Sequence, residues 1–186
     1  MRKISFKNRK NQAGLTLIEM VVTLGVFAFA MTEIMGVYMA ILRVDEKSRG
    51  VRLVEQNARF ITEFIIRETR NGVINYGTPP GNYAGAVPTP STELRLINAD
   101  NEQERIYLSG GTLVLEKFGV GSSNLSGAQV TVSNVRFYVR PTDGTTTTVQ
   151  PQVTFSFTVA ADIGVHTPTV VRRSFQSSAI TREYHQ

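Results

Sequence analysis

No arrangement of residues in this sequence points to catalysis or to metal binding. The chain has no cysteine, which excludes disulfides and thiolate metal sites. Its two histidines, His166 and His185, lie outside any spaced ligand pattern, and its many serines and threonines have no convincing base partner. The sequence therefore predicts no enzyme, and neither a cofactor nor a metal is expected.

A cluster of polar and acidic side chains lies between residues 98 and 104. Oxygen donors of this kind suit calcium, but their spacing does not match a known calcium loop. We favour a solvated turn, with calcium binding as the alternative. The cluster consists of Asn98, Asp100, Asn101, Glu102 and Glu104.

The most informative acid is Glu19, because it stands inside a long apolar segment. Residues 15–42 hold only two ionisable side chains, Glu19 and Glu33. As a helix this segment is about 42 Å long, more than the roughly 30 Å of a hydrocarbon core. A carboxylate at the bilayer centre costs about 2.5–3.5 kcal/mol on insertion scales, so Glu19 needs a partner or a shallow position. Glu33 falls near the far interface, where an acid costs little; a second polar contact inside the helix bundle is the alternative.

The basic character of the chain belongs to its first residues. The formal net charge is +5, and the part of the chain after Gly14 is formally neutral. An excess of Lys and Arg before the apolar segment keeps the amino end in the cytoplasm and sends the rest across the membrane. The basic residues of this leader are Arg2, Lys3, Lys7, Arg9 and Lys10.

Three ordinary explanations of the apolar segment fit less well. A secretory signal has an apolar stretch of about 7–15 residues with small residues after it, whereas the pair Ala13-Gly14 precedes this longer segment. A plain signal anchor fits the length but gives no reason for Glu19. A buried helix of a soluble protein is rarely this long.

The residues Ala13 to Glu19, AGLTLIE, resemble the prepilin signature of type IV pilins. That signature is a Gly followed by an apolar residue, Thr, Leu, an aliphatic residue and Glu, and Leu15 replaces the usual Phe. The resemblance implies that prepilin peptidase cuts between Gly14 and Leu15 and methylates the new amino terminus on Leu15. It further implies that Glu19 neutralises the Leu15 amine of a neighbouring subunit and sets the axial register of assembly.

The helical pattern continues beyond the apolar segment to a stop at Asn71-Gly72. Acid-first pairs at i,i+4 are predicted for Asp45–Arg49, Glu55–Arg59 and Glu63–Arg67. These interleaved acids favour a solvated helix face over nucleic-acid binding. One face is apolar at helical spacing and carries Val44, Val51, Val54, Ala58, Ile61 and Ile65.

A loop rich in Gly and Pro follows over residues 76–91, and short β-rich runs come after it. Ser109 to Thr112 predicts a hairpin turn, and Asp143-Gly144 with the following threonines predicts a loop between longer strands. The fold class is therefore α+β and pilin-like, with a long helix packed on an antiparallel sheet. The predicted strands are residues 93–97, 105–108, 112–118, 129–139, 152–160 and 169–180.

The predicted organisation is a leader (1–14), a transmembrane and filament-core helix (15–42), an amphipathic helix half (43–72) and a β-sheet head (73–186). Residues 56–60 and 66–70, with 105–108 and 110–113, resemble the larger minor subunits. The resemblance implies a minor pilin of a type IV pilus or a minor pseudopilin of a type II secretion system.

The expected location is the inner membrane, crossed once, with the head outside the cytoplasm, and then the pilus or pseudopilus. Expected partners are prepilin peptidase, other pilin subunits, the inner-membrane assembly platform and membrane lipid; nucleic acid is not expected. Two alternatives stay open: a membrane-anchored binding protein that does not polymerise, and a DNA-uptake pilin.

Overall fold

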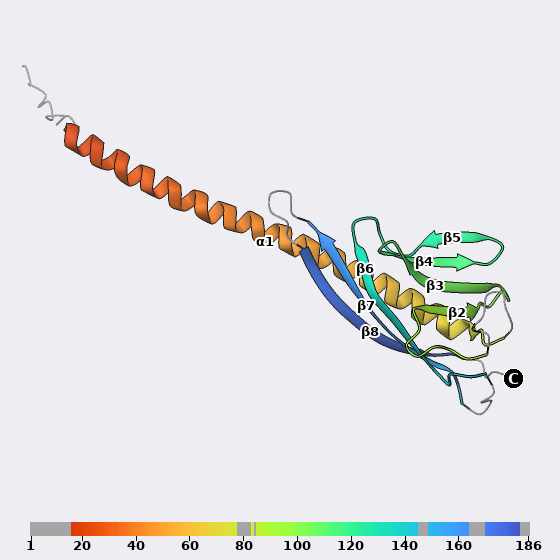
Figure 1. The fold of residues 1–186 in the computed structure, drawn as a ribbon. Coiled ribbons are helices and arrows are strands. Elements are labelled where there is room, and N and C mark those ends of the chain that lie inside the picture. The colour runs from red at the N-terminus through yellow and green to blue at the C-terminus, as the bar shows by residue number, and fades with distance from the viewer. Residues whose placement is uncertain (1–15, 78–82, 84, 145–148, 164–169, 183–186) are drawn as a thin grey trace, which may run out of the picture. The chain divides into compact units, whose positions relative to one another are not determined.

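The computed structural model describes residues 16–77, 83, 85–144, 149–163 and 170–182. They form one helix, α1 (Leu17–Asn71), followed by strands (Figure 1). The chain divides into two compact units, residues 1–44 and 45–186. The strands are β1 (Val73–Ile74), β2 (Glu93–Ile97), β3 (Gln103–Ser109), β4 (Thr112–Lys117), β5 (Gly121–Asn124), β6 (Thr131–Arg140), β7 (Gln152–Asp162) and β8 (Val170–Ile180).

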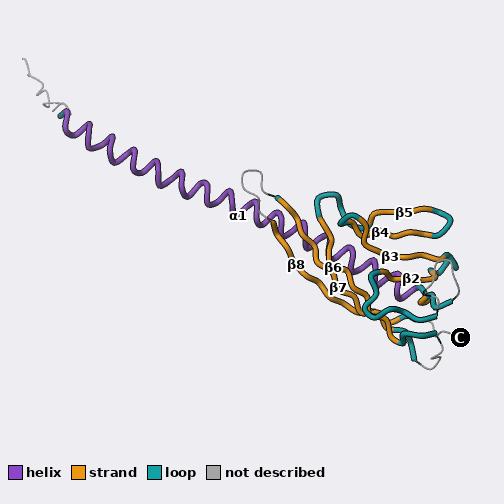
Figure 2. The backbone as a smooth tube through the Cα atoms, in the orientation of Figure 1, coloured by secondary structure: helices purple, strands orange, loops and turns teal. Residues whose placement is uncertain are grey.

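The strands of the second unit form two antiparallel sheets (Figure 2). The first has the order β1-β2-β3-β4-β5 and the second the order β6-β7-β8, so within each sheet every strand pairs with its neighbours in sequence. The α+β class, with one long helix before antiparallel sheet, is confirmed. The sequence did not show that a break between β5 and β6 divides the strands between two sheets.

The core of the second unit lies between α1 and the inner faces of both sheets. Buried residues of α1 recur every three or four positions, which places them on one helix face. The predicted apolar face of the helix included Val44, and this is wrong, because Val44 is 65% exposed. Gly50 and Thr69, which were not predicted to lie on this face, are buried. Large core side chains include Ile61, Ile65, Leu94, Ile106, Phe137 and Phe155.

The helix ends at Asn71, as the sequence predicted. The N–H of Gly72 donates to the carbonyl of Glu68 at 2.8 Å. A Cβ on Gly72 would lie 2.7 Å from the carbonyl oxygen of Ile97 in β2. Glycine therefore stands here because the end of α1 and the backbone of β2 approach each other closely.

Each predicted strand corresponds to an observed one, and β1 and β5 were not predicted. The hairpin turn is confirmed: Ser109 pairs with Thr112, and Gly110 and Gly111 have φ of 55° and 81°. Two successive residues at positive φ are typical of a type I′ turn, whose backbone twist matches that of the two strands it joins. In β6 the register shifts between Ser133 and Arg136. The threonines 145–148 lie outside the described residues.

One of the predicted ion pairs on α1 forms and another is replaced. Arg49 contacts Asp45 at 2.8 Å, which confirms the first pair. Glu55 contacts Arg173 of β8 at 3.0 Å instead of Arg59, because β8 brings a cation to the helix. The ion pair therefore ties the helix to a strand rather than one helical turn to the next.

The third predicted pair, between Glu63 and Arg67, is also replaced. Nε of Arg67 lies 3.3 Å from Oε1 of the adjacent Glu68. The guanidinium of Arg67 also lies 5.1 Å from the centre of the Phe64 ring. The ring and the neighbouring carboxylate together draw Arg67 away from Glu63.

Candidate functional site

The amino end of α1 is capped by the side chain of Thr16, the residue before the helix. The N–H of Glu19 lies 3.1 Å from the carbonyl oxygen of Thr16 and 3.4 Å from its hydroxyl oxygen. Thr16 and Glu19 occupy the two positions of a capping box, in which the acid belongs to the first turn. The predicted cleavage residues Gly14 and Leu15 immediately precede this turn and lie outside the described residues.

The first part of α1 exposes its apolar side chains all round. An 18-residue window of this helix is apolar enough to cross a membrane, and none of the window is buried. The helix is thus unlike the core helix of a soluble protein, whose apolar face is covered. The exposed side chains include Leu17, Ile18, Val22, Phe27, Phe29 and Ile34.

Polar groups within this apolar segment are few, and some satisfy themselves locally. The Thr23 hydroxyl donates to the Met20 carbonyl at 2.9 Å, and the Thr32 hydroxyl donates to the Phe29 carbonyl at 2.7 Å. Such bonds give each hydroxyl group a hydrogen-bond partner where no water is available. Glu19 is left as the acid of the first turn, the position that the prepilin signature assigns to it.

Residues 98–102 of the polar cluster form the turn between β2 and β3, and Glu104 lies in β3. Oδ1 of Asn98 accepts the N–H groups of Asp100 at 3.0 Å and Glu102 at 2.9 Å. The Glu102 carboxylate accepts from Asn98 at 3.0 Å and from Lys117 at 2.8 Å. These oxygens hold the turn together, which supports the solvated turn. Among the described residues no group of three or more His, Asp or Glu side chains could hold a metal.

Glu104 departs from the rest of that cluster, because its side chain is buried. It is 1% exposed, and its Oε1 has no hydrogen-bond partner within the described part of the chain. Burial, followed by the nearby charge of Glu68, raises the pKa of Glu104 to about 7. Sequence reasoning missed this burial, although Glu104 shares its strand face with Ile106.

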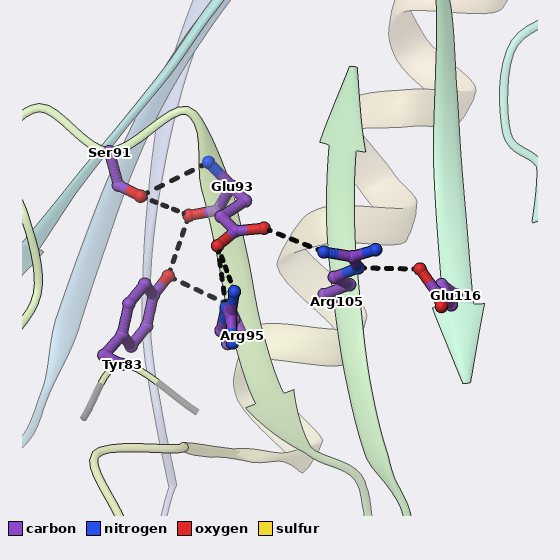
Figure 3. A network of polar contacts seen from close by, with 6 residues as sticks. All are labelled: Tyr83, Ser91, Glu93, Arg95, Arg105 and Glu116. Carbon is purple, nitrogen blue, oxygen red and sulfur yellow. Dashed lines mark hydrogen bonds and ion pairs between the residues drawn. The ribbon is translucent and has the colours of Figure 1, made fainter. Parts of the chain in front are cut away.

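The outer face of the first sheet carries a network of polar contacts (Figure 3). The guanidinium of Arg105 lies 2.7 Å from Glu116 and 3.5 Å from Glu93, and 4.4 Å from the centre of the Tyr107 ring. Glu93 also accepts from Nε of Arg95 at 2.8 Å. Both arginines are therefore matched by carboxylates of the same sheet.

Tyr83 fastens the loop before β2 to this network. Its hydroxyl donates to the Glu93 carbonyl at 2.8 Å and accepts the N–H of Arg95 at 2.9 Å (Figure 3). Burial raises the pKa of the Tyr83 hydroxyl, so it stays protonated and keeps donating. The network thus attaches Tyr83, which precedes β2, to that strand, and the charged side chains in it contact one another. The histidines His166 and His185 lie outside the described residues.

The comparisons with known proteins identify the amino-terminal segment. A family model described as the prokaryotic N-terminal methylation motif matches residues 9–32. This motif is typical of type IV pilins and pseudopilins, so it and the α+β fold support a type IV pilin-like or pseudopilin subunit. The motif implies processing by prepilin peptidase and assembly with other pilins, and the class is structural rather than enzymatic.

The motif covers the last six residues of the leader, from Arg9, and the first turns of α1, and therefore includes the predicted junction and Glu19. An apolar amino-terminal helix carrying this motif fits a single-pass anchor in the inner membrane. No curated protein and no solved structure matched the chain.

Proposed function

We propose that this chain is a minor pilin or minor pseudopilin of a type IV pilus or a type II secretion system. The observation that carries the proposal is the exposed apolar part of α1, which begins with a capped turn containing Glu19 inside the methylation motif. A helix that exposes apolar side chains on all sides requires lipid or other helices around it. Membrane lipid before assembly and neighbouring subunits after it meet this requirement in turn.

Processing follows from the same segment. Prepilin peptidase cuts between Gly14 and Leu15 on the cytoplasmic side and methylates the amine of Leu15. The leader carries the positive charges that hold this end in the cytoplasm, so the head lies outside it. Once the leader is removed, the assembly platform in the inner membrane adds the subunit to a filament.

Assembly uses Glu19 as the partner of a positive charge. The new amine of Leu15 lies about one helical turn from Glu19 of its own chain. In the filament, Glu19 of an incoming subunit pairs with the Leu15 amine of a subunit already present. This pairing removes an isolated carboxylate from apolar surroundings and fixes the axial position of the subunit.

The mature amino terminus tests the proposal. The full chain, co-expressed with prepilin peptidase, is purified from membranes and analysed by mass spectrometry. We expect N-methyl-Leu15 as the first residue, and we expect Gly14→Val to retain the leader while Ala13→Val is still cut. An intact Met1 in the wild type, or a cut after the apolar segment, would show instead an anchored protein that does not polymerise.

A further inference from the structure

Among the described residues, the outer face of the second sheet carries more arginines than acids. Alternate residues of a strand point to the same face, and from Arg136 onward the even-numbered residues of β6 point away from the core. Within the described part of the chain, none of the arginines on this face pairs with a carboxylate. One acid, Asp162, stands on the same face at the last residue of β7. The arginines are Arg136, Arg140 and Arg172.

The first sheet shows the opposite arrangement. There Arg95 contacts Glu93 of its own strand, and Arg105 contacts Glu116 of the neighbouring strand β4 (Figure 3). On the second sheet, Arg136 donates to the backbone carbonyl of Val135 at 3.0 Å, and Arg140 has no hydrogen-bond or ion-pair partner among the described residues. The two sheets therefore differ: the arginines on the outer face of the first contact carboxylates, and those on the outer face of the second do not within the described residues.

A hollow of about 380 Å³ lies on this face around Arg140. Two backbone bridges hold the loop before β2 against the second half of β6 and the residues after it. They join Ala86 to Asp143 and Ser91 to Phe137. Thr89 of that loop thereby closes one side of the hollow. The lining residues are Thr89, Tyr138, Arg140, Thr154, Ser156 and Gln176.

The lining has one cation, one aromatic ring and several groups that both donate and accept hydrogen bonds. Four hydroxyls, including that of Tyr138, and one amide suit a ligand with several hydroxyl groups. The guanidinium of Arg140 suits a single carboxylate, which it can hold through two parallel bonds. Tyr138 is 41% exposed and offers a flat apolar surface beside that cation. The volume lies within the range of small-ligand sites, about 300–1,000 Å³.

We propose that this hollow binds an acidic saccharide, with the sugar carboxylate on Arg140, its hydroxyls on the polar side chains and its apolar ring face on Tyr138. A nucleic acid fits less well, because stacked bases need successive aromatic rings and Tyr138 is the one ring on the described outer face. An acidic polypeptide fits less well, because the hollow holds a single cation among hydroxyl groups.

The test uses the full chain in detergent micelles and isothermal titration calorimetry with trigalacturonate, a three-sugar acid. Its fully methyl-esterified form keeps the hydroxyl groups but lacks the charge. We expect binding of the acid and at least about tenfold weaker binding of the ester, since the charge-assisted bonds are lost. This comparison uses the wild-type protein and does not depend on the folding of any variant.

Two variants locate the site. Arg140→Gln is expected to weaken trigalacturonate binding about tenfold, whereas Arg172→Gln, which removes the same charge from the same face outside the hollow, changes it less than about twofold. Tyr138→Ala is also expected to weaken binding, and Tyr138→Phe to retain most of it.

The proposal is overturned if trigalacturonate does not bind at about 1 mM, or if its ester binds equally well. It also fails if the two arginine variants have equal effects, because charge anywhere on the face would then suffice. Tighter binding of oligothymidylate or hexaglutamate than of trigalacturonate would assign the face to a nucleic acid or an acidic protein instead.

Discussion

Glu104 and Lys117 stand directly opposite each other in the register of β3 and β4, yet Nζ of Lys117 contacts Glu102, at 2.8 Å. Glu104 faces the core, where its Oε1 has no hydrogen-bond partner within the described residues. Since burial and the charge of Glu68 raise its pKa to about 7, the core contains an acid that is partly protonated at neutral pH. The stability of the head should therefore depend on pH.

The first prediction is that the head loses stability as the pH rises from about 4.5 to about 7 and then levels off. The folded pKa of Glu104 is above the unfolded value of 4.5, so the unfolded state releases its proton first and deprotonation favours unfolding. The loss for such a shift is on the order of 3 kcal/mol. Urea unfolding of the full chain in micelles, followed by circular dichroism across this pH range, measures it.

Glu104→Gln should flatten this pH profile and stabilise the head at pH 8, because the neutral amide has no proton to lose. Glu63→Gln is the matched control, since Glu63 is exposed on α1. An unchanged slope in Glu104→Gln would mean that another group is responsible for the pH dependence.

The second prediction concerns Asn57, which joins α1 to the segment before β6. Its Oδ1 accepts the N–H of Gly127 at 3.0 Å, and its Nδ2 donates to the Leu53 carbonyl at 2.9 Å. Asn57→Ala leaves the Gly127 N–H without this partner, so we expect a loss of about 1–2 kcal/mol in the free energy of unfolding. Gln56→Ala, at an exposed position of the same helix, should change it by less than about 0.5 kcal/mol. Equal effects would show that Asn57 acts only through helix propensity.

The third prediction uses the contact between α1 and Ile163. A Cβ on Gly50 would overlap the Ile163 side chain and lie 3.1 Å from Cγ2 of Val171. Gly50→Leu should therefore destabilise the head by about 1–3 kcal/mol through overpacking. Gly50→Ala should be better tolerated in an Ile163→Val background, where the overlapping methyl is gone and the gain of about 1 kcal/mol in helix propensity remains. Thermal melts of the wild type, Gly50→Ala, Ile163→Val and the double variant test this. If the two substitutions change the stability additively, the side chain at position 50 does not contact Ile163.

The strands that the sequence predicted are those with an apolar alternation. In β7, Val153, Phe155 and Phe157 are buried and alternate with more exposed residues, so the period alone defines the strand. β5 has the sequence GSSN and is exposed throughout, so it has no apolar signal and exists because it pairs with β4. Pairing across a hairpin is tertiary information that a single run of polar residues does not contain.

The irregularity in β6 could have been found from its sequence. Val132 and Val135 are both buried, although strict alternation over an odd spacing would place one of them outside. The register shift after Ser133, with Asn134 at φ 53°, inserts the extra residue that brings both to the core. An apolar pattern that changes parity within one strand is thus a signal for a bulge.

The two candidate sites differ in how much the sequence reveals. Glu19 stands out because an acid inside an apolar segment is costly, and because Gly14 and Leu15 complete a motif of adjacent residues. The hollow around Arg140 combines a loop and three strands. No spacing along the chain indicates that Thr89 and Gln176 lie on the same hollow, because only the folded sheet brings them together.

The last prediction separates Glu19 from Glu33, the two acids of the apolar part of α1. They lie about 21 Å apart along the helix axis, and only Glu19 is within about one turn of the amine that processing would create on Leu15. We therefore expect Glu19→Ala to lower incorporation into filaments by more than about tenfold, since it leaves a buried charge without its partner. Glu33→Ala should be incorporated normally.

Glu19→Gln distinguishes the charge from the cap. Glutamine keeps the capping position next to Thr16 but cannot neutralise an amine. If pairing of charges guides assembly, Glu19→Gln behaves like Glu19→Ala; if only the cap matters, it behaves like the wild type. The readout is the ratio of subunit in sheared filaments to subunit in membranes, with the mature amino terminus checked by mass spectrometry. If a correctly processed Glu19→Ala subunit is incorporated like the wild type, Glu19 does not pair with the amine during assembly. If Glu33→Ala shows an equal defect, the helix bundle requires acids in general and Glu19 has no specific role.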